Sequence, residues 1–225
     1  MVSLLLAAIF FVGIHLFVSG TGLRQRLVDK LGELPYLGLF SVLSLVGIVW
    51  LCSAYGALTS ENDLWHPDVV KPPVYLLMLF AFQFVVIGLT TPSPTAAGGE
   101  AVLDQDEPAR GMLRVTRHPF LWGVAMWAVS HLLISGDVPS LMFFGAFLVL
   151  ALVGPSSIDA KRKKKHGERW DRFATVTSSL PFAAIASGRN SLRIGEIGWW
   201  RIALGLVLFV TAQYAHEWAF GVSPF

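Results

Sequence analysis

The sequence of 225 residues has few charged residues and almost no cysteine. Charged residues make up 14% of the chain, whereas a soluble domain carries about 25%. Hydrophobic residues make up 54%, and the mean hydropathy is +0.61. This composition excludes an ordinary soluble domain and indicates a membrane protein. The single cysteine, Cys52, excludes an intrachain disulfide and a thiolate metal cluster.

The sequence also lacks a nucleotide-binding glycine motif and internal repeats. Its densest charge run, Lys161-Arg162-Lys163-Lys164-Lys165, is basic. Such a run beside apolar stretches is typical of an anchor against anionic lipid headgroups, so we expect membrane lipids as partners and no nucleic acid.

Six apolar stretches predict an all-α, polytopic helical bundle, because about 20 apolar residues are needed to cross a bilayer. The fourth and fifth stretches are short and are joined by a tight turn, so we expect a short hairpin there. The length suits one membrane domain over residues 1–225. The predicted helices cover 2–18, 36–55, 74–90, 120–134, 140–155 and 198–220.

The positive-inside rule sets the expected orientation. With both termini outside, every one of the 17 basic residues except Lys71 lies on the inner side. The first stretch lacks a positive n-region, which favours a retained helix over a signal peptide. Residues 156–197 then form a basic cytoplasmic or interfacial segment, in which "WDRFATVTSSLPFAAIASGR" could lie along the interface as an amphipathic helix.

Two histidines, His15 and His131, fall deep within apolar stretches. An ionisable residue in a membrane span is a functional candidate, because its presence there costs free energy. Each could instead make an interhelical hydrogen bond, or it could ligate a metal through its neutral imidazole. His216, near the outer end of the last stretch, is the alternative ligand.

Two opposed histidines are more typical of a b-type haem site than of a structural zinc site or a non-haem iron site. Structural zinc takes four ligands, and a non-haem iron triad adds a carboxylate that the apolar stretches lack. His118 and His131 are about 20 Å apart on one helix, so they cannot share an ion. His15 and His131 are expected to differ in depth by roughly 5–10 Å, which tilted helices or a re-entrant hairpin would close.

The motif "TRHPF" places Arg117 and His118 before a proline at a predicted helix start. Free N–H groups and the helix dipole favour an anion there. With Arg114 nearby, the motif predicts a carboxylate or phosphate site. A haem propionate and a lipid phosphate are the two candidates.

Four segments together resemble the NnrU family of integral membrane proteins: "GTGLRQRL", "VTRHPFLWGVAMWAVSHLLISGD", "SLMFFGAFLVLALVGP" and "WDRFATVTSSLPFAAIASGR". The resemblance implies a bacterial inner-membrane protein connected with nitrogen-oxide metabolism. It also implies haem b as the cofactor, with His15 and His131 as ligands. Nitric oxide or an apolar small molecule would be the bound partner.

The family's plant relative is a haem-dependent zeta-carotene cis-trans isomerase, so isomerisation of a polyene is the alternative function. That relative has a cysteine involved in a ligand change at the position of Ala128. A more distant resemblance, to isoprenylcysteine and phospholipid methyltransferases, implies S-adenosylmethionine near Arg117 and His118. Those enzymes carry a Glu-Glu pair where this sequence has only Asp159.

Overall fold

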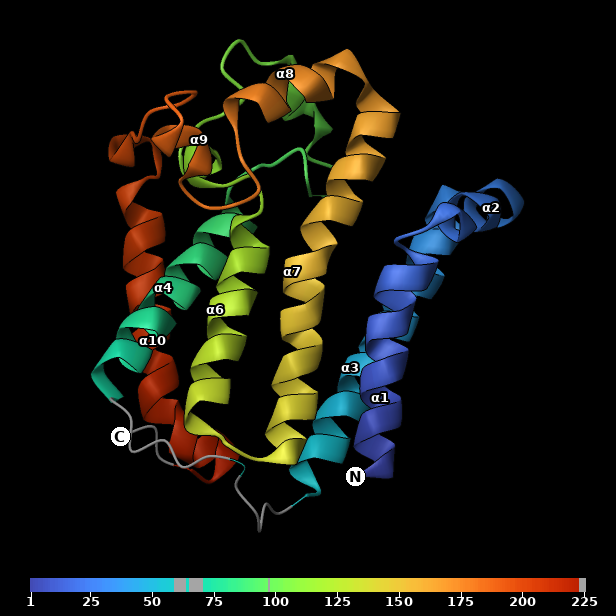
Figure 1. Ribbon diagram of the computed structural model, residues 1–225, viewed down its shortest axis with the longest axis vertical. Helices are drawn as coiled ribbons and strands as arrows, with labels where there is room; N and C mark the ends of the chain where they lie inside the picture. Colours follow the sequence, from blue (N-terminus) through green and yellow to red (C-terminus); the bar gives the residue numbers. More distant parts are fainter. Residues whose placement is uncertain (59–63, 65–70, 97, 223–225) are drawn as a thin grey trace. The chain divides into compact units, whose positions relative to one another are not determined.

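The computed structural model describes residues 1–58, 64, 71–96 and 98–222, and every regular element in these ranges is helical (Figure 1). The predicted all-α class is therefore confirmed for the described residues. The elements are α1 (Val2–Gly13), η1 (Ile14–Val18), α2 (Gly22–Leu31), α3 (Glu33–Gly56), α4 (Lys71–Thr90), η2 (Glu100–Asp104), α5 (Met112–Val115), α6 (Pro119–Ile134), α7 (Val138–His166), α8 (Glu168–Val176), α9 (Ala183–Ala186), η3 (Ile194–Glu196) and α10 (Trp199–Phe220).

The chain divides into two compact units. Unit 1 comprises Met1–Lys71 and Ala128–Ile158, and unit 2 comprises Pro72–Trp127 and Asp159–Phe225. Helices α6 and α7 each contribute one part to each unit. The expectation of a single domain over the whole chain stays a prediction.

Three helices are long and apolar enough to cross a membrane: Glu33–Gly56, Pro72–Thr90 and Val138–His166. A fourth is reached if Val2–Val18 and Gly22–Leu31, which meet at a bend of 79°, form one span. Helix α6 is apolar but shorter, with 16 residues, as expected for the fourth stretch. These helices support a membrane protein, while the count of six spans stays a prediction.

The fifth predicted helix was wrong in length. It was expected over 140–155, but α7 has 29 residues and continues through Pro155 into the basic run. The fall in hydropathy after Pro155 marks the end of the apolar stretch and not the end of the helix. Lysine and arginine are good helix formers, so the helix continues in a polar environment.

Unit 1 is built on the packing of α1 against α3. A Cβ on Gly47 would lie 3.2 Å from ring atoms of Phe10 and Phe11, so the glycine permits close approach of these rings. Near the other end of α1, the Trp50 indole N–H donates to the Ser3 hydroxyl over 3.0 Å.

Unit 2 holds α4 and α6 in backbone contact. A Cβ on Gly88 would lie 2.5 Å from the Phe120 nitrogen, and one on Gly123 would lie 2.7 Å from the Val85 nitrogen. Only residues without side chains allow this approach. It fixes the start of α6, where the "TRHPF" motif lies.

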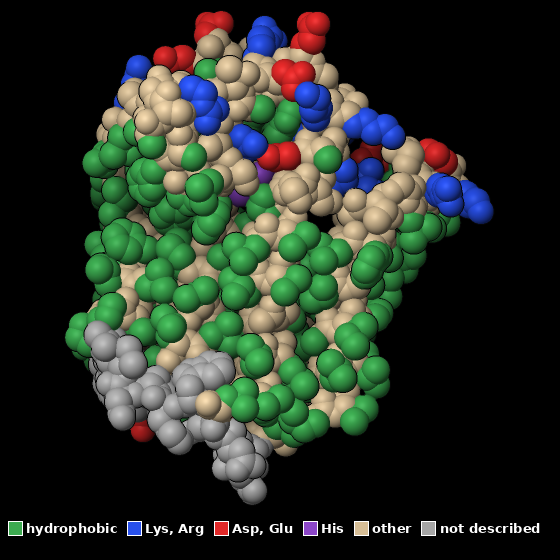
Figure 2. All heavy atoms as spheres, in the orientation of Figure 1, with side chains coloured by type: hydrophobic (Ala, Val, Ile, Leu, Met, Phe, Trp, Pro, Cys, Tyr) green, Lys and Arg blue, Asp and Glu red, His purple; other side chains and the backbone are tan. Residues whose placement is uncertain are grey.

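Helix α8 is amphipathic, and its apolar face packs against other residues of unit 2. Trp170 and Phe173 are 2% and 0% exposed. They pack in one cluster with Val102, Leu103 and Leu113. The apolar face of α8 is thus covered by the protein itself, and the expectation that the segment lies along the interface stays a prediction. Figure 2 shows charged side chains gathered over α8 and the loops beside it in unit 2.

Candidate functional site

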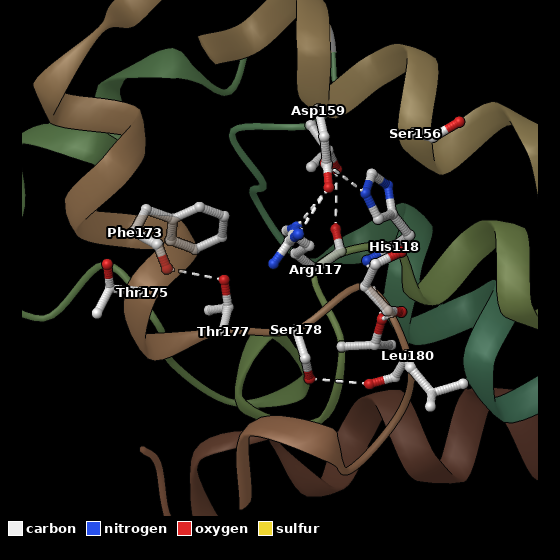
Figure 3. A network of polar contacts seen from close by, with 12 residues as sticks. Arg117, His118, Ser156, Asp159, Phe173, Thr175, Thr177, Ser178 and Leu180 are labelled. Atoms are coloured by element: carbon white, nitrogen blue, oxygen red, sulfur yellow. Dashed lines mark hydrogen bonds and ion pairs between the residues drawn. The ribbon is translucent and has the colours of Figure 1, made fainter. Parts of the chain in front are cut away.

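Unit 2 contains a polar centre formed by Arg117, His118 and Asp159 (Figure 3). His118 directly precedes α6, and Asp159 lies on α7. The His118 Nε2–H donates to Asp159 Oδ1 over 2.7 Å. Arg117 donates to Asp159 Oδ2 from Nε over 2.9 Å and from Nη2 over 2.7 Å. One carboxylate thus accepts from both basic side chains.

This centre is largely removed from solvent. The side chains of His118, Arg117 and Asp159 are 1%, 14% and 19% exposed. Buried charges need close partners because desolvation is costly, and the short contacts of Asp159 supply them. The centre is therefore a tightly held acid–base cluster.

Backbone contacts with the segment after α8 hold the motif in place. The Arg117 N–H donates to the Ser178 carbonyl over 3.0 Å, and the Thr116 hydroxyl donates to the Ser179 carbonyl over 2.7 Å. The Trp122 indole N–H also donates to Ser179, over 2.8 Å. These bonds fix the backbone of the motif and therefore the direction in which the side chains of Arg117 and His118 point.

Sequence reasoning missed Asp159 as the partner of Arg117 and His118. The motif predicted an anion from outside the chain, but here the chain itself supplies the carboxylate. A signal existed, because Asp159 is the only acidic residue on α7 and lies just before its basic run. The external anion stays a prediction, and it would have to displace Asp159.

Arg114 belongs to a different network. Its guanidinium binds Glu196 through two hydrogen bonds of 2.7 and 3.0 Å, and it also donates to Asn190 over 2.7 Å. The Gly111 N–H donates to the same carboxylate over 2.9 Å. The bonds from Arg114 lower the pKa of Glu196 to about 2. Arg114 thus fastens the segment before α10 and is not shared with Asp159.

In unit 1, His15 lies in the π-helical turn η1, an irregularity that often marks functional sites. Its Nδ1–H donates to the Phe11 carbonyl over 2.7 Å. The Ser44 hydroxyl then donates to Nε2 over 3.3 Å. A backbone bond at Nδ1 is the contact that sets the tautomer of a metal-ligating imidazole. Here the Nε2 lone pair accepts the Ser44 hydroxyl, which a metal ion would have to displace.

His131 faces α7, where its ring stacks on Phe144 with centroids 4.4 Å apart. A chain of ring contacts connects it to His15 through α7. Successive centroid distances along this chain are 5.0, 5.3, 5.5 and 4.6 Å. The rings, which we call the aromatic path, are His131, Phe144, Phe143, Phe147, Phe11 and His15.

The two histidines lie at different levels along α3. Ser44 contacts His15, whereas Tyr55 stacks on Phe143 and lies against Phe144, the neighbour of His131. From residue 44 to residue 55, α3 rises about 16 Å. The two rings therefore do not fit one iron between them in this arrangement. Among the described residues, no three His, Cys, Asp or Glu side chains group together as metal ligands.

His216, the alternative ligand, lies on α10 in unit 2. Its Nδ1–H donates to the Val222 carbonyl over 2.8 Å, and its ring packs beside Phe220. These contacts are local to the end of α10 and resemble an ordinary helix-end arrangement.

The sequence matches the NnrU protein family over residues 3–224. It is 26% identical over 196 residues to the chloroplastic 15-cis-zeta-carotene isomerase of Zea mays and 27% identical to that of Arabidopsis thaliana. Each alignment covers 85% of this chain and 52% of the relative, so the chain spans about half the length of these relatives. No solved structure matches. The chain belongs to the NnrU family.

Proposed function

We propose that this protein isomerises carbon–carbon double bonds of an apolar polyene within a membrane, with haem b as its cofactor. The aromatic path of unit 1 carries this proposal. It joins two histidines of membrane-type helices through four phenylalanine rings. The plant relatives are 15-cis-zeta-carotene isomerases, which supports the same chemistry here.

A polyene needs a surface of this kind. Its conjugated chain is apolar and offers no group for a salt bridge, so burial against apolar and aromatic side chains is the available source of affinity. Phe143 and Phe144 are 8% and 5% exposed, so a polyene would reach these two rings only after neighbouring side chains move.

Haem would be held by His15 and His131, and it would supply a redox-active iron. The tautomer of His15 suits ligation, because Nδ1 is bonded to the Phe11 carbonyl. The different levels of the two histidines do not suit one iron, so ligation by both requires unit 1 to rearrange. Arg117 and His118 remain proposed partners of a haem carboxylate, in competition with Asp159.

Absorption spectra of the detergent-purified protein test the cofactor. We expect near-stoichiometric haem b, with a sharp α band after reduction by dithionite. His15→Ala and His131→Ala should each change the spectrum or the haem content, whereas His216→Ala, the matched control, should not. If only one of the first two variants has an effect, the iron has a single protein ligand of this pair. Absence of haem after expression with haem supplied would overturn the cofactor.

A connection with nitrogen-oxide metabolism is the second proposed role, and membership of the NnrU family favours it. Here nitric oxide would be the ligand of the reduced haem. Addition of nitric oxide to the reduced protein should shift the Soret band if this role is correct. An unchanged spectrum would count against it.

A methyltransferase that uses S-adenosylmethionine is the third candidate. The assembled cluster of Arg117, His118 and Asp159 favours it, because a buried acid–base centre at a helix start is a place where a charged cofactor could bind. Calorimetric titration with S-adenosylmethionine tests this function, with Asp159→Asn as the variant. Lack of binding to the wild-type protein would eliminate it.

The proposed setting is a bacterial inner membrane crossed six times, with both termini outside. The distribution of basic residues supports this topology, because all but Lys71 then lie inside. Reporter fusions after residues 20, 58, 136 and 222 would test on which side of the membrane each position lies. The topology predicts that residue 20 is inside and that the other three are outside. A periplasmic signal from the fusion after residue 20 would contradict the topology.

A further inference from the structure

We propose that α2 lies flat in the membrane interface and binds anionic phospholipid headgroups. The helix follows η1 at a bend of 79° from the preceding helical segment. It has ten residues, which span about 15 Å, too short to cross a bilayer. No residue of α2 is buried within the protein. This helix therefore presents most of its surface to its surroundings.

The bend is built into the local sequence. A Cβ on Gly20 would lie 2.0 Å from the Leu16 carbonyl oxygen, so the turn there requires glycine. Thr21 follows as the N-cap, and its hydroxyl accepts the Leu23 N–H over 3.2 Å. Because this side chain satisfies a free N–H at the helix start, α2 begins at a defined point and in a new direction.

One face of α2 is apolar. Leu23, Leu27 and Leu31 are four residues apart and form a single stripe. Leu23 and Leu31 are 43% and 46% exposed, and Leu34, just beyond the helix, is 80% exposed. The protein leaves this stripe partly uncovered, as expected for a face that enters the acyl boundary of a bilayer.

The remaining surface of α2 carries charge. Gln25 and Asp29 lie opposite the leucine stripe and are joined by a hydrogen bond of 2.8 Å. Arg26 and Lys30 are exposed and border the stripe. Figure 2 shows basic side chains gathered over α2 at this end of unit 1. A long basic side chain beside an apolar face can bury its stem and reach a lipid phosphate.

The charge of the α2 surface indicates that its partner is anionic lipid. Arg24 is already held within the protein, by Glu33 at 3.3 Å and over the Tyr36 ring at 5.3 Å. Arg26 and Lys30 therefore provide the cations for an external anion. A re-entrant α2 would carry Arg26, Asp29 and Lys30 into hydrocarbon, which is costly. A helix lying in the interface avoids this cost and places both cations at the phosphate level.

This placement fixes the depth of His15. His15 lies three residues before the end of η1, about 5 Å from the bend along the helix axis. Because α2 rests at the headgroup level, His15 lies just inside the apolar layer.

Site-directed spin labelling of the full chain in lipid nanodiscs tests the inference. In a Cys52→Ser background, labels are placed at Leu23→Cys and Gln25→Cys, which face opposite sides of α2. Leu45→Cys, at a residue 62% exposed on α3, is the hydrocarbon reference. We expect oxygen to relax the label at 23 more than a nickel chelate does, and the reverse ratio at 25.

Three outcomes would overturn the interfacial placement. Equal nickel access at 23 and 25 would put α2 in water, and hydrocarbon-like values at both would make it re-entrant. Dipolar broadening between labels would show that a second copy of the chain covers the stripe.

Varying the lipid composition tests whether α2 prefers anionic headgroups. The label at 23 should move deeper in phosphatidylglycerol than in phosphatidylcholine nanodiscs, and Arg26→Gln with Lys30→Gln should abolish this difference. An identical depth in both lipids for the unmodified helix would overturn recognition of anionic headgroups.

Discussion

At the scale of single residues, Asp159 joins the two basic side chains of the polar centre of unit 2. Its carboxylate is bonded to both Arg117 and His118, at 2.7 Å in each case. The sequence predicted the two basic residues as a site but not their partner, because the contact joins positions about 40 residues apart. Such a pairing depends on how α7 packs beside the start of α6.

Asp159→Asn should therefore destabilise the protein strongly. It removes the charge that compensates a guanidinium and an imidazole, both largely buried, and breaking a buried pair costs about 3–5 kcal/mol. Thermal unfolding in detergent measures the effect. Asp171→Asn is the control, because the Lys163–Asp171 pair is exposed at 65% and 50%. Equal losses in the two variants would show that Asp159 does not hold the centre.

The lowered pKa of Glu196 predicts how the stability of the protein depends on pH. Its pKa is lowered from 4.5 to about 2 by Arg114, so the folded state favours the ionised carboxylate. The stability it contributes is complete above pH 4.5 and is lost as the pH falls toward 2. At neutral pH, the Glu196→Gln variant should have a lower free energy of unfolding than the wild-type protein. This difference should shrink as the pH falls from 4.5 toward 2. A constant difference from pH 5 to pH 2 would contradict this assignment.

At the scale of elements, glycines decide how closely α4 and α6 approach. Gly123 faces Val85 and the Ala81 carbonyl, and an added Cβ would lie within 2.9 Å of both. The hydropathy of the two helices was visible in the sequence, but their closest contact was not, because it depends on which glycines face each other. The Arg117–His118 motif at the head of α6 takes its position from this contact.

Gly123→Ala should thus destabilise unit 2 by about 1–3 kcal/mol through overpacking. Gly145→Ala on α7 is the matched control, since a Cβ there meets nothing within 4 Å. The control should be neutral or slightly stabilising, because alanine favours a helix over glycine by up to about 1 kcal/mol. Unfolding midpoints of both variants in detergent check the prediction, and a Gly123→Ala midpoint at or above the control would refute it.

At the scale of the whole molecule, composition and hydropathy were sufficient to predict an all-helical membrane protein, and the four motif segments were sufficient to identify the NnrU family. The helical class and the short α6 were confirmed. The length of α7 and the packing of α8 within unit 2 were not foreseen, because both depend on what surrounds a polar helix. The division into two units depends on long-range packing and has no local sequence signal.

For the candidate site, the sequence identified His15 and His131 and expected them to differ in depth. The structure connects them by the aromatic path and places them at separate levels. Ring contacts between α1, α6 and α7 could not be predicted, because they depend on the rotation of each helix.

The most direct test of the account is conversion of 15-cis-zeta-carotene by the purified protein in liposomes under reducing conditions, followed by chromatographic separation of the isomers. We expect the wild-type protein and His216→Ala to deplete the 15-cis isomer at equal rates, and His15→Ala and His131→Ala to be slower by at least tenfold. No depletion by haem-loaded wild-type protein, or equal rates in all four proteins, would contradict the proposal that the aromatic path is the site of polyene isomerisation.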